Sequence, residues 1–208
     1  MESASVAVGH AGEHEHHGPP EAHQSSRIDR QTLGILLFIV SEVMLFGAFF
    51  ASYFFIRVVA NDGPWPPDNL TLPVGVAGVN TAILISSSFT VHWALESIRR
   101  DNRRGMIMGL GATFLLGFTF LFIQFNEYIH LGFSARVDAF ASIFYGLTGL
   151  HGAHVTVGLT LLAFANIRAW RGHFSKEPKK HLGVEVPGIY WHFVDVMWII
   201  VFTTVYIL

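Results

Sequence analysis

The chain has 208 residues, of which 51% are hydrophobic and 13% are charged, about half the charged share of an average globular protein. Its 13 basic and 15 acidic residues give a formal charge of −2, so it lacks the basic excess that nucleic-acid binding requires. The absence of cysteine excludes disulfides, thiolate metal sites, iron–sulfur clusters and a cysteine nucleophile. The composition indicates a membrane protein whose chemistry rests on histidine, carboxylates and lipid.

Residues 1–26 mix His, Glu, Gly and Pro without apolar periodicity, which predicts a disordered tail. The tail lacks the apolar core of a cleaved signal peptide, so the first span is expected to be an anchor. Its histidines could hold copper, zinc or nickel weakly, but no feature of the tract fixes a coordination geometry, and a solvated tail is favoured. These histidines are His10, His14, His16, His17 and His23.

Five apolar runs follow, each about as long as the 20 residues that a helix needs to cross a bilayer. They predict an all-α integral membrane bundle of five transmembrane helices in residues 27–208. Spans two and four are rich in small residues, which let helix backbones approach closely within a membrane. The predicted spans cover about 33–59, 72–95, 106–125, 139–167 and 188–208.

Basic residues divide unevenly between the two ends of these spans. Eleven of the 13 lie in the N-terminal tail and in the loops 96–105 and 168–187, which five spans place on one side of the membrane. Only Arg57 and Arg136 fall on the other side. Because basic loops stay inside, the N-terminus is predicted to be cytoplasmic and Leu208 to lie outside.

An ionisable side chain within a span is a candidate functional residue, because its burial in hydrocarbon is costly. Glu42 lies nine residues into the first span, within the stretch SEVMLF. We expect it to be protonated, or to face a polar cleft or a partner subunit. Two roles stay open: a proton-carrying or partner-facing carboxyl, and a neutral helix-packing residue.

Two pairs of polar residues lie at helical spacing in later spans, one of two histidines and one of a histidine and a carboxylate. His151 and His154 are three residues apart near the middle of the fourth span, and His192 and Asp195 have the same spacing in the fifth. This spacing suits metal ligands, so a metalloenzyme using Glu42, His151, His154 and Asp195 is one alternative. Interhelical hydrogen bonding is favoured, and we expect Asp195 to satisfy His192 locally as a structural clasp.

Glu127 falls at the outer end of the third span, where a solvated helix end is one interpretation and an interhelical contact another. No phosphate-binding loop, Ser-His-Asp order or paired-carboxylate arrangement is present, so the chain itself shows no catalytic motif. A small transporter would be expected to show an inverted repeat. None is found in the sequence.

Six stretches in order resemble subunit III of the haem–copper respiratory oxidases, the cytochrome c and quinol oxidase family, from about residue 33 to residue 208. The resemblance implies an accessory subunit of a proton-pumping terminal oxidase, with no catalysis of its own and no haem or copper of its own. The stretches are SEV at 41–43 with FGAFF at 46–50, WPP at 65–67, NT at 80–81 with SSS at 86–88, Gln124 with Glu127 and Tyr128, GLHGAHV at 149–155, and YWHFVDVMW at 190–198.

The resemblance also implies partners and a location. Haem and copper reside in the partner subunits; subunit I is the main partner, and subunit II and a small subunit IV are further ones. Family members have two helix groups separated by a lipid-filled cleft, and this five-helix form, typical of bacterial members, lacks the first two of seven helices. We therefore expect a multi-pass protein of the bacterial inner membrane that stabilises subunit I, binds phospholipid and supports proton uptake. Cytochrome c is the expected donor and quinol the alternative, and either binds elsewhere in the complex.

Carried over by motif, Glu42 matches the family's buried carboxyl. The side chains expected to form interhelical polar contacts are Asn80, Glu127, His151, His154, His192 and Asp195. The basic loop after the fourth span resembles the family loop that holds phospholipid headgroups, and electrostatics favours that role independently, at about 1 kcal/mol per basic residue near an anionic leaflet. The expected headgroup-binding residues are Arg168, Arg171, His173, Lys179, Lys180 and His181.

Overall fold

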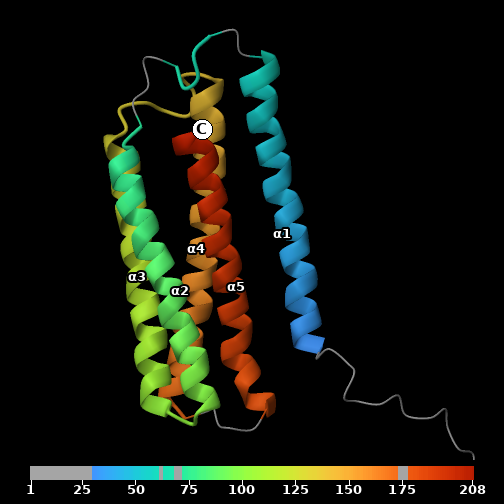
Figure 1. The fold of residues 1–208 in the computed structure, drawn as a ribbon, viewed down its shortest axis with the longest axis vertical. Helices are drawn as coiled ribbons and strands as arrows, with labels where there is room; N and C mark the ends of the chain where they lie inside the picture. Colours follow the sequence, from blue (N-terminus) through green and yellow to red (C-terminus); the bar gives the residue numbers. More distant parts are fainter. Residues whose placement is uncertain (1–29, 61–62, 68–71, 173–177) are drawn as a thin grey trace, which may run out of the picture.

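The computed structural model describes residues 30–60, 63–67, 72–172 and 178–208, and the predicted tail of residues 1–26 lies outside this part. The described residues form an all-α bundle of long, nearly parallel rods (Figure 1). The helices are α1 (Arg30–Phe55), continued by the π-helical turn η2 (Ile56–Ala60), α2 (Val74–Arg99), α3 (Arg103–His130), α4 (Ala139–Trp170), and α5 (Pro178–Phe202), continued by the π-helical turn η3 (Thr203–Ile207).

Five helices in the described part are long and apolar enough to cross a membrane, which confirms the predicted fold class. The helices are longer than the apolar runs that revealed them. α3 extends beyond the predicted 106–125 at both ends, and α5 begins at Pro178 instead of residue 188, with Pro187 inside the helix. Hydropathy marks only the lipid-facing part of a helix, whereas backbone hydrogen bonding continues into the interface.

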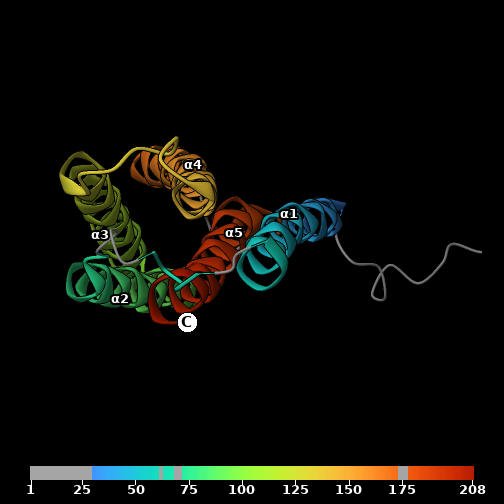
Figure 2. The same ribbon diagram turned by 90° about the horizontal axis from the view of Figure 1, so that it is seen from above.

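The helices form a group of four, α2 to α5, with α1 beside it (Figure 2). α1 packs against α4 and α5, and it is the least buried of the five spans. α2 and α3 form the closest pair. A Cβ at Gly109 of α3 would lie only 2.8 Å from the Cβ of Ala94 in α2, so the glycine allows this close approach.

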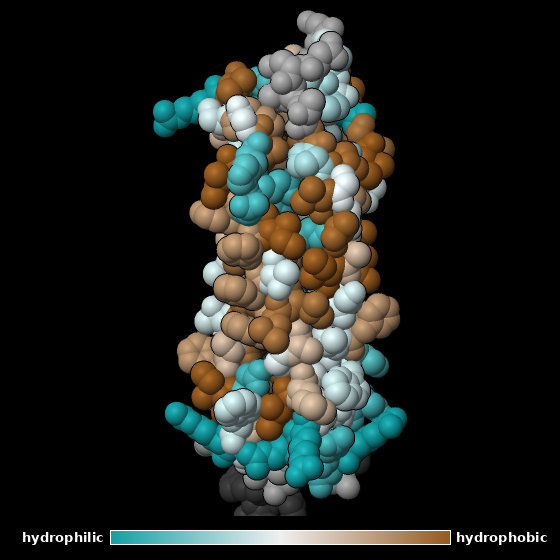
Figure 3. Space-filling view, turned by 90° about the vertical axis from the view of Figure 1, so that its left-hand side faces the viewer, coloured by the Kyte–Doolittle hydropathy of each residue, from teal (hydrophilic) through white to brown (hydrophobic). Residues whose placement is uncertain are grey.

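The surface between the two ends of the bundle is largely apolar, with hydrophilic residues gathered at the ends (Figure 3). As the sequence predicts, the described basic residues lie mostly at one end of the bundle. Arg99, Arg100, Arg103 and Arg104, at the α2–α3 turn, lie at the end of the bundle where α1 and α5 begin. Arg57 lies at the opposite end of α1. Which end faces the cytoplasm stays a prediction.

Candidate functional site

A contact between a carboxyl and an imidazole joins α1 to α4 within the apolar spans. Glu42 Oε2 lies 2.8 Å from His154 Nε2, and the Nδ1 of the same imidazole lies 2.8 Å from the backbone carbonyl of Leu150. A carbonyl oxygen can only accept, so Nδ1 carries a hydrogen and donates to it. The contact between Nε2 and the carboxyl then holds one further proton. The pair is therefore either a neutral carboxylic acid and imidazole or an ion pair, and it carries no net charge in either form.

The surroundings of this pair come from three helices. The Phe46 ring of α1, fully buried, lies 5.0 Å from the His154 ring between centroids. Tyr190 of α5 donates from its hydroxyl to the His154 carbonyl oxygen at 3.4 Å. The side chains of Glu42 and His154 keep 16% and 11% of their surface exposed. The pair is therefore enclosed but still reachable, and it can hold or pass a single proton.

A second polar cluster joins α2 to α5. Ser88 donates to Asp195 Oδ2, and its hydroxyl oxygen lies 3.3 Å from His192 Nδ1. In the described residues no hydrogen bond joins His192 directly to Asp195. The expected local clasp is therefore wrong in detail: the two side chains lie three residues apart on α5, but they meet through a serine from the neighbouring helix.

His151 does not form the interhelical hydrogen bond that the sequence predicts. Neither of its ring nitrogens has a hydrogen-bond partner in the described structure. The ring instead lies 4.8 Å from Trp198 and 5.7 Å from Phe120, measured between centroids. The correction has a geometric cause, because positions three apart on a helix differ by about 60° in direction. His154 thus faces α1 while His151 faces the aromatic core.

Asn80 and Glu127 both connect α3 to other elements. Asn80 of α2 donates from Nδ2 to the Phe120 carbonyl oxygen at 3.2 Å. Glu127 is only 6% exposed, and its Oε1 accepts a hydrogen bond from the Tyr206 hydroxyl of η3 at 3.2 Å. The interpretation of Glu127 as a solvated helix end is therefore wrong, and an interhelical contact takes its place.

The four residues of the alternative metal site do not lie together in the structure. Glu42 and His154 pair with each other, His151 lies among aromatic rings, and Asp195 contacts Ser88. Across the described ranges, no three His, Asp or Glu side chains lie close enough together to hold a metal ion.

The expected headgroup residues are only partly described. Arg168 and Arg171 lie at the end of α4, and Arg171 lines an apolar groove between α3 and α4. His173 and the side chains of Lys179, Lys180 and His181 lie outside the described part of the structure.

Sequence reasoning missed several side chains that complete these contacts. Ser88, Tyr190 and Tyr206 each contact a predicted polar residue from another element. The sequence places Arg103 only in a basic loop, whereas in the structure its Nη2 donates to the Trp170 carbonyl oxygen at 2.6 Å and satisfies the end of α4. Such partners have no local signal, because a serine or tyrosine is common on any membrane helix.

Comparison with known proteins agrees with the resemblance found in the sequence. Residues 15–208 match the family model of cytochrome c oxidase subunit III. The chain is 40% identical over 208 residues to cytochrome c oxidase subunit 3 of Thermostichus vulcanus, which covers 100% of this chain and 95% of the relative. Identity to the subunit 3 of Synechocystis sp. is 41% over 197 residues, covering 94% and 79% of the two chains.

A further bacterial relative gives the same result. The chain is 40% identical over 187 residues to the probable cytochrome c oxidase subunit 3 of Rickettsia bellii, covering 84% of this chain and 68% of the relative. The five apolar helices and the matching family model thus point to the same class of membrane protein. This chain belongs to the cytochrome c oxidase subunit III family.

Proposed function

We propose that this chain is the accessory subunit III of a proton-pumping terminal oxidase in a bacterial inner membrane. It packs against subunit I, while the haem and copper that reduce oxygen reside in subunits I and II. Cytochrome c is the proposed electron donor, because the relatives bear the name cytochrome c oxidase. A quinol oxidase is the alternative, since donor binding belongs to other subunits.

The Glu42–His154 pair is the observation that carries this proposal. It places a carboxyl and an imidazole 2.8 Å apart within the apolar spans, where burial of an ionisable group is costly and such a group is a candidate functional residue. A carboxyl and an imidazole in hydrogen-bond contact are the kind of side chains that form proton relays in membrane proteins. Its proposed role is to support proton uptake by the neighbouring catalytic subunit.

α1 supports the proposed contact with subunit I. Its inner side packs on α4 and α5, and it is the least buried span of the chain. Large apolar side chains cover the remaining surface, including Leu37, Val40 and Met44. A contiguous apolar helix face of this kind can pack against another transmembrane helix or against lipid. Glu42 lies on the same helix, which brings the proposed proton site close to that partner.

Phospholipid binding is proposed for the basic end of the bundle. The groove between α3 and α4 has a volume of about 610 Å³ and ends at Trp170 and Arg171. Apolar side chains such as Phe114 and Ile167 line it, which suits an acyl chain. Arg168 and Arg171 lie near its end, where an anionic headgroup would meet positive charge.

The functional test uses the assembled oxidase with Glu42→Gln. We expect unchanged haem content and initial oxygen reduction, together with fewer protons pumped per electron or faster loss of activity during turnover. Glu185→Gln is the matched control, because it removes a carboxyl that pairs with Arg99 at 3.6 Å outside the Glu42 site. Loss of haem from the Glu42 variant would contradict the proposal, and so would pumping and turnover equal to the control.

A second test asks whether redox chemistry resides in this chain. Purified alone, the chain should show no haem absorbance. After co-purification with its partners, a visible spectrum and a donor assay with cytochrome c and with quinol would distinguish the two oxidase classes. Stoichiometric iron or zinc in a chain lacking residues 1–26 would favour the metalloenzyme alternative instead.

A further inference from the structure

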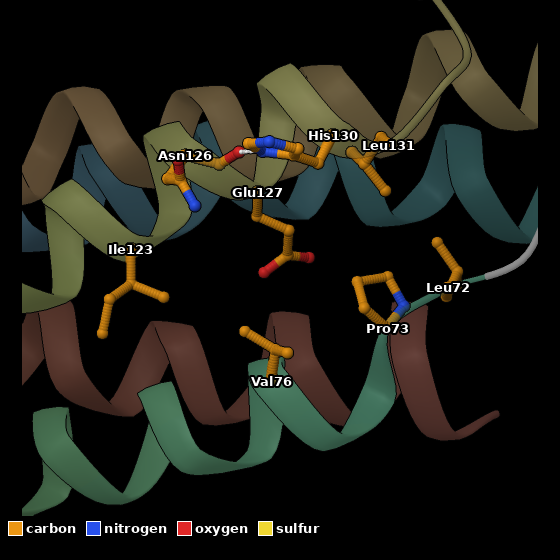
Figure 4. Close-up of a pocket in the computed structure, with 8 residues that line it drawn as sticks. All are labelled: Leu72, Pro73, Val76, Ile123, Asn126, Glu127, His130 and Leu131. Carbon is orange, nitrogen blue, oxygen red and sulfur yellow. Dashed lines mark hydrogen bonds between the residues drawn. The ribbon is translucent and has the colours of Figure 1, made fainter.

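A pocket of about 320 Å³ opens between the start of α2 and the end of α3, at the end of the bundle opposite the basic loops. Pro73, Val76 and Ile123 form apolar walls, and Asn126 and His130 line it as polar groups. The carboxyl group of Glu127 points from α3 into the space in front of α2 (Figure 4).

One of the two carboxyl oxygens of Glu127 has no hydrogen-bond partner in the described structure. The residue is only 6% exposed, Oε1 accepts from Tyr206 at 3.2 Å, and Oε2 has no protein partner. The structure describes no salt bridge to this carboxylate. Arg57, at the same end of the bundle, instead donates to the Leu208 carbonyl oxygen at 2.8 Å. A buried carboxylate with a vacant oxygen is a strong acceptor for a charged donor.

The surroundings of the pocket indicate an amphiphile from the membrane. At the pocket, the wall residue Val76 of α2 is 50% exposed, and Val79 on the next turn of the same helix is 63% exposed. These side chains lie within the apolar spans that the bilayer surrounds. A ligand that reaches Glu127 from this side has an apolar body and a small charged head.

We propose that this pocket binds the primary ammonium headgroup of a membrane amphiphile, of the phosphatidylethanolamine class, with Glu127 as its counter-ion. The ammonium N–H groups donate to the vacant Oε2, a charge-assisted hydrogen bond that replaces the missing internal partner. A trimethylated ammonium has no N–H to donate, so phosphatidylcholine is discriminated against. The Asn126 amide at the pocket offers a donor for the lipid phosphate. This site is separate from the phospholipid residues proposed at the basic end.

The test uses the intact oxidase complex, reconstituted in nanodiscs of phosphatidylethanolamine and phosphatidylcholine and then washed with mild detergent. Mass spectrometry counts the lipid that each complex retains. We expect Glu127→Gln to lower the affinity for phosphatidylethanolamine about tenfold, as expected for loss of one charge-assisted contact. Gln keeps an acceptor for Tyr206. Asp138→Asn is the matched control, because it removes a carboxylate at the same end of the bundle yet preserves the N-cap bond to Ala141.

A second variant tests the pocket without changing Glu127. Val76→Phe places a larger side chain in the wall, and we expect the same lipid to be lost. Free ethanolamine distinguishes the sources of the ammonium: failure to displace the lipid supports a lipid headgroup, and stoichiometric binding of the free amine alone overturns it. Equal retention of phosphatidylethanolamine in wild type, the Glu127 variant and the Asp138 control would also overturn the proposal, as would equal retention of phosphatidylcholine. An unchanged haem spectrum verifies that each complex is intact.

Discussion

The indole ring of Trp191 in α5 lies directly against the backbone of Gly158 in α4. A Cβ at Gly158 would lie 2.9 Å from the ring atom Cε3, closer than a real Cβ contact. A Cβ at Gly117 of α3 would meet the same ring, at 2.7 Å from Cζ2. Trp191 Nε1 also donates to Ser87 Oγ of α2 at 2.8 Å. One side chain thus holds four helices at a fixed spacing.

Gly158→Ala is expected to destabilise the bundle, because the added methyl group must displace a fully buried ring. We expect a loss of about 1–3 kcal/mol, the usual cost of overpacking a core. Gly149→Ala is the control on the same helix, since a Cβ there meets no atom within 4 Å. There alanine should be neutral or stabilising, by about 0.5–1 kcal/mol in a helix interior. Equal unfolding midpoints of the two variants in detergent would refute the tight packing.

The Glu42–His154 contact should show energetic coupling in a double-mutant cycle. Glu42→Gln and His154→Gln each remove one partner of the only polar link that the described structure gives between α1 and α4. We expect a coupling energy of about 0.5–3 kcal/mol from unfolding midpoints. The control cycle is Glu96 with Arg100, an exposed pair four residues apart on α2, for which coupling of about 0.3–0.5 kcal/mol is usual. Additive effects at Glu42 and His154 would mean that the contact does not stabilise the α1–α4 packing.

Tyr53→Phe is expected to weaken the link between η3 and the α1–α2 connection. The Tyr53 hydroxyl, fully buried, donates to the Thr204 carbonyl oxygen at 2.8 Å and accepts from Trp65 Nε1 at 2.9 Å. Removing it leaves the buried Thr204 carbonyl oxygen unpaired, at about 1–3 kcal/mol before relaxation, and it also removes the acceptor of the half-buried Trp65 Nε1.

The control for this variant is Tyr145→Phe. Tyr145 donates to the Phe133 carbonyl oxygen at 2.9 Å, but its ring is only half-buried. Water can replace its hydroxyl, so the loss in unfolding free energy should be clearly smaller than at Tyr53. A similar loss in unfolding free energy for both variants would show that the burial of the Tyr53 hydrogen bonds adds no stability.

The spans were predictable because burial in a bilayer is decided by composition along the chain alone. The same reasoning located Glu42 and His154, since ionisable residues are conspicuous in apolar runs. It could not tell that these two meet, because they lie 112 positions apart in sequence. Packing between the spans decides which helices are neighbours. No periodic pattern in the sequence reveals that packing.

The faces of α4 show where spacing alone fails. His151 and His154 are only three residues apart, and this spacing predicts similar contacts for both. α4, however, lies between α1 and the aromatic core, so a modest rotation around the helix separates a polar contact from a ring stack. The sequence left two interpretations of Glu127 open for a related reason: its partner Tyr206 comes from the last turn of the chain.

Orientation in the membrane can be tested with single cysteines, because the chain has none of its own. Arg100 lies at the exposed α2–α3 turn and Ala135 in the exposed connection between α3 and α4, at opposite ends of the bundle. Eleven of the 13 basic residues lie on the side of the first turn, so the positive-inside rule places Arg100 in the cytoplasm.

In intact cells, a membrane-impermeant maleimide should therefore label Ala135→Cys and spare Arg100→Cys until the cells are permeabilised. Leu147→Cys, at a fully buried position in α4, should stay unlabelled in both states and controls for unfolding. Labelling in the reverse order would place the basic loops outside.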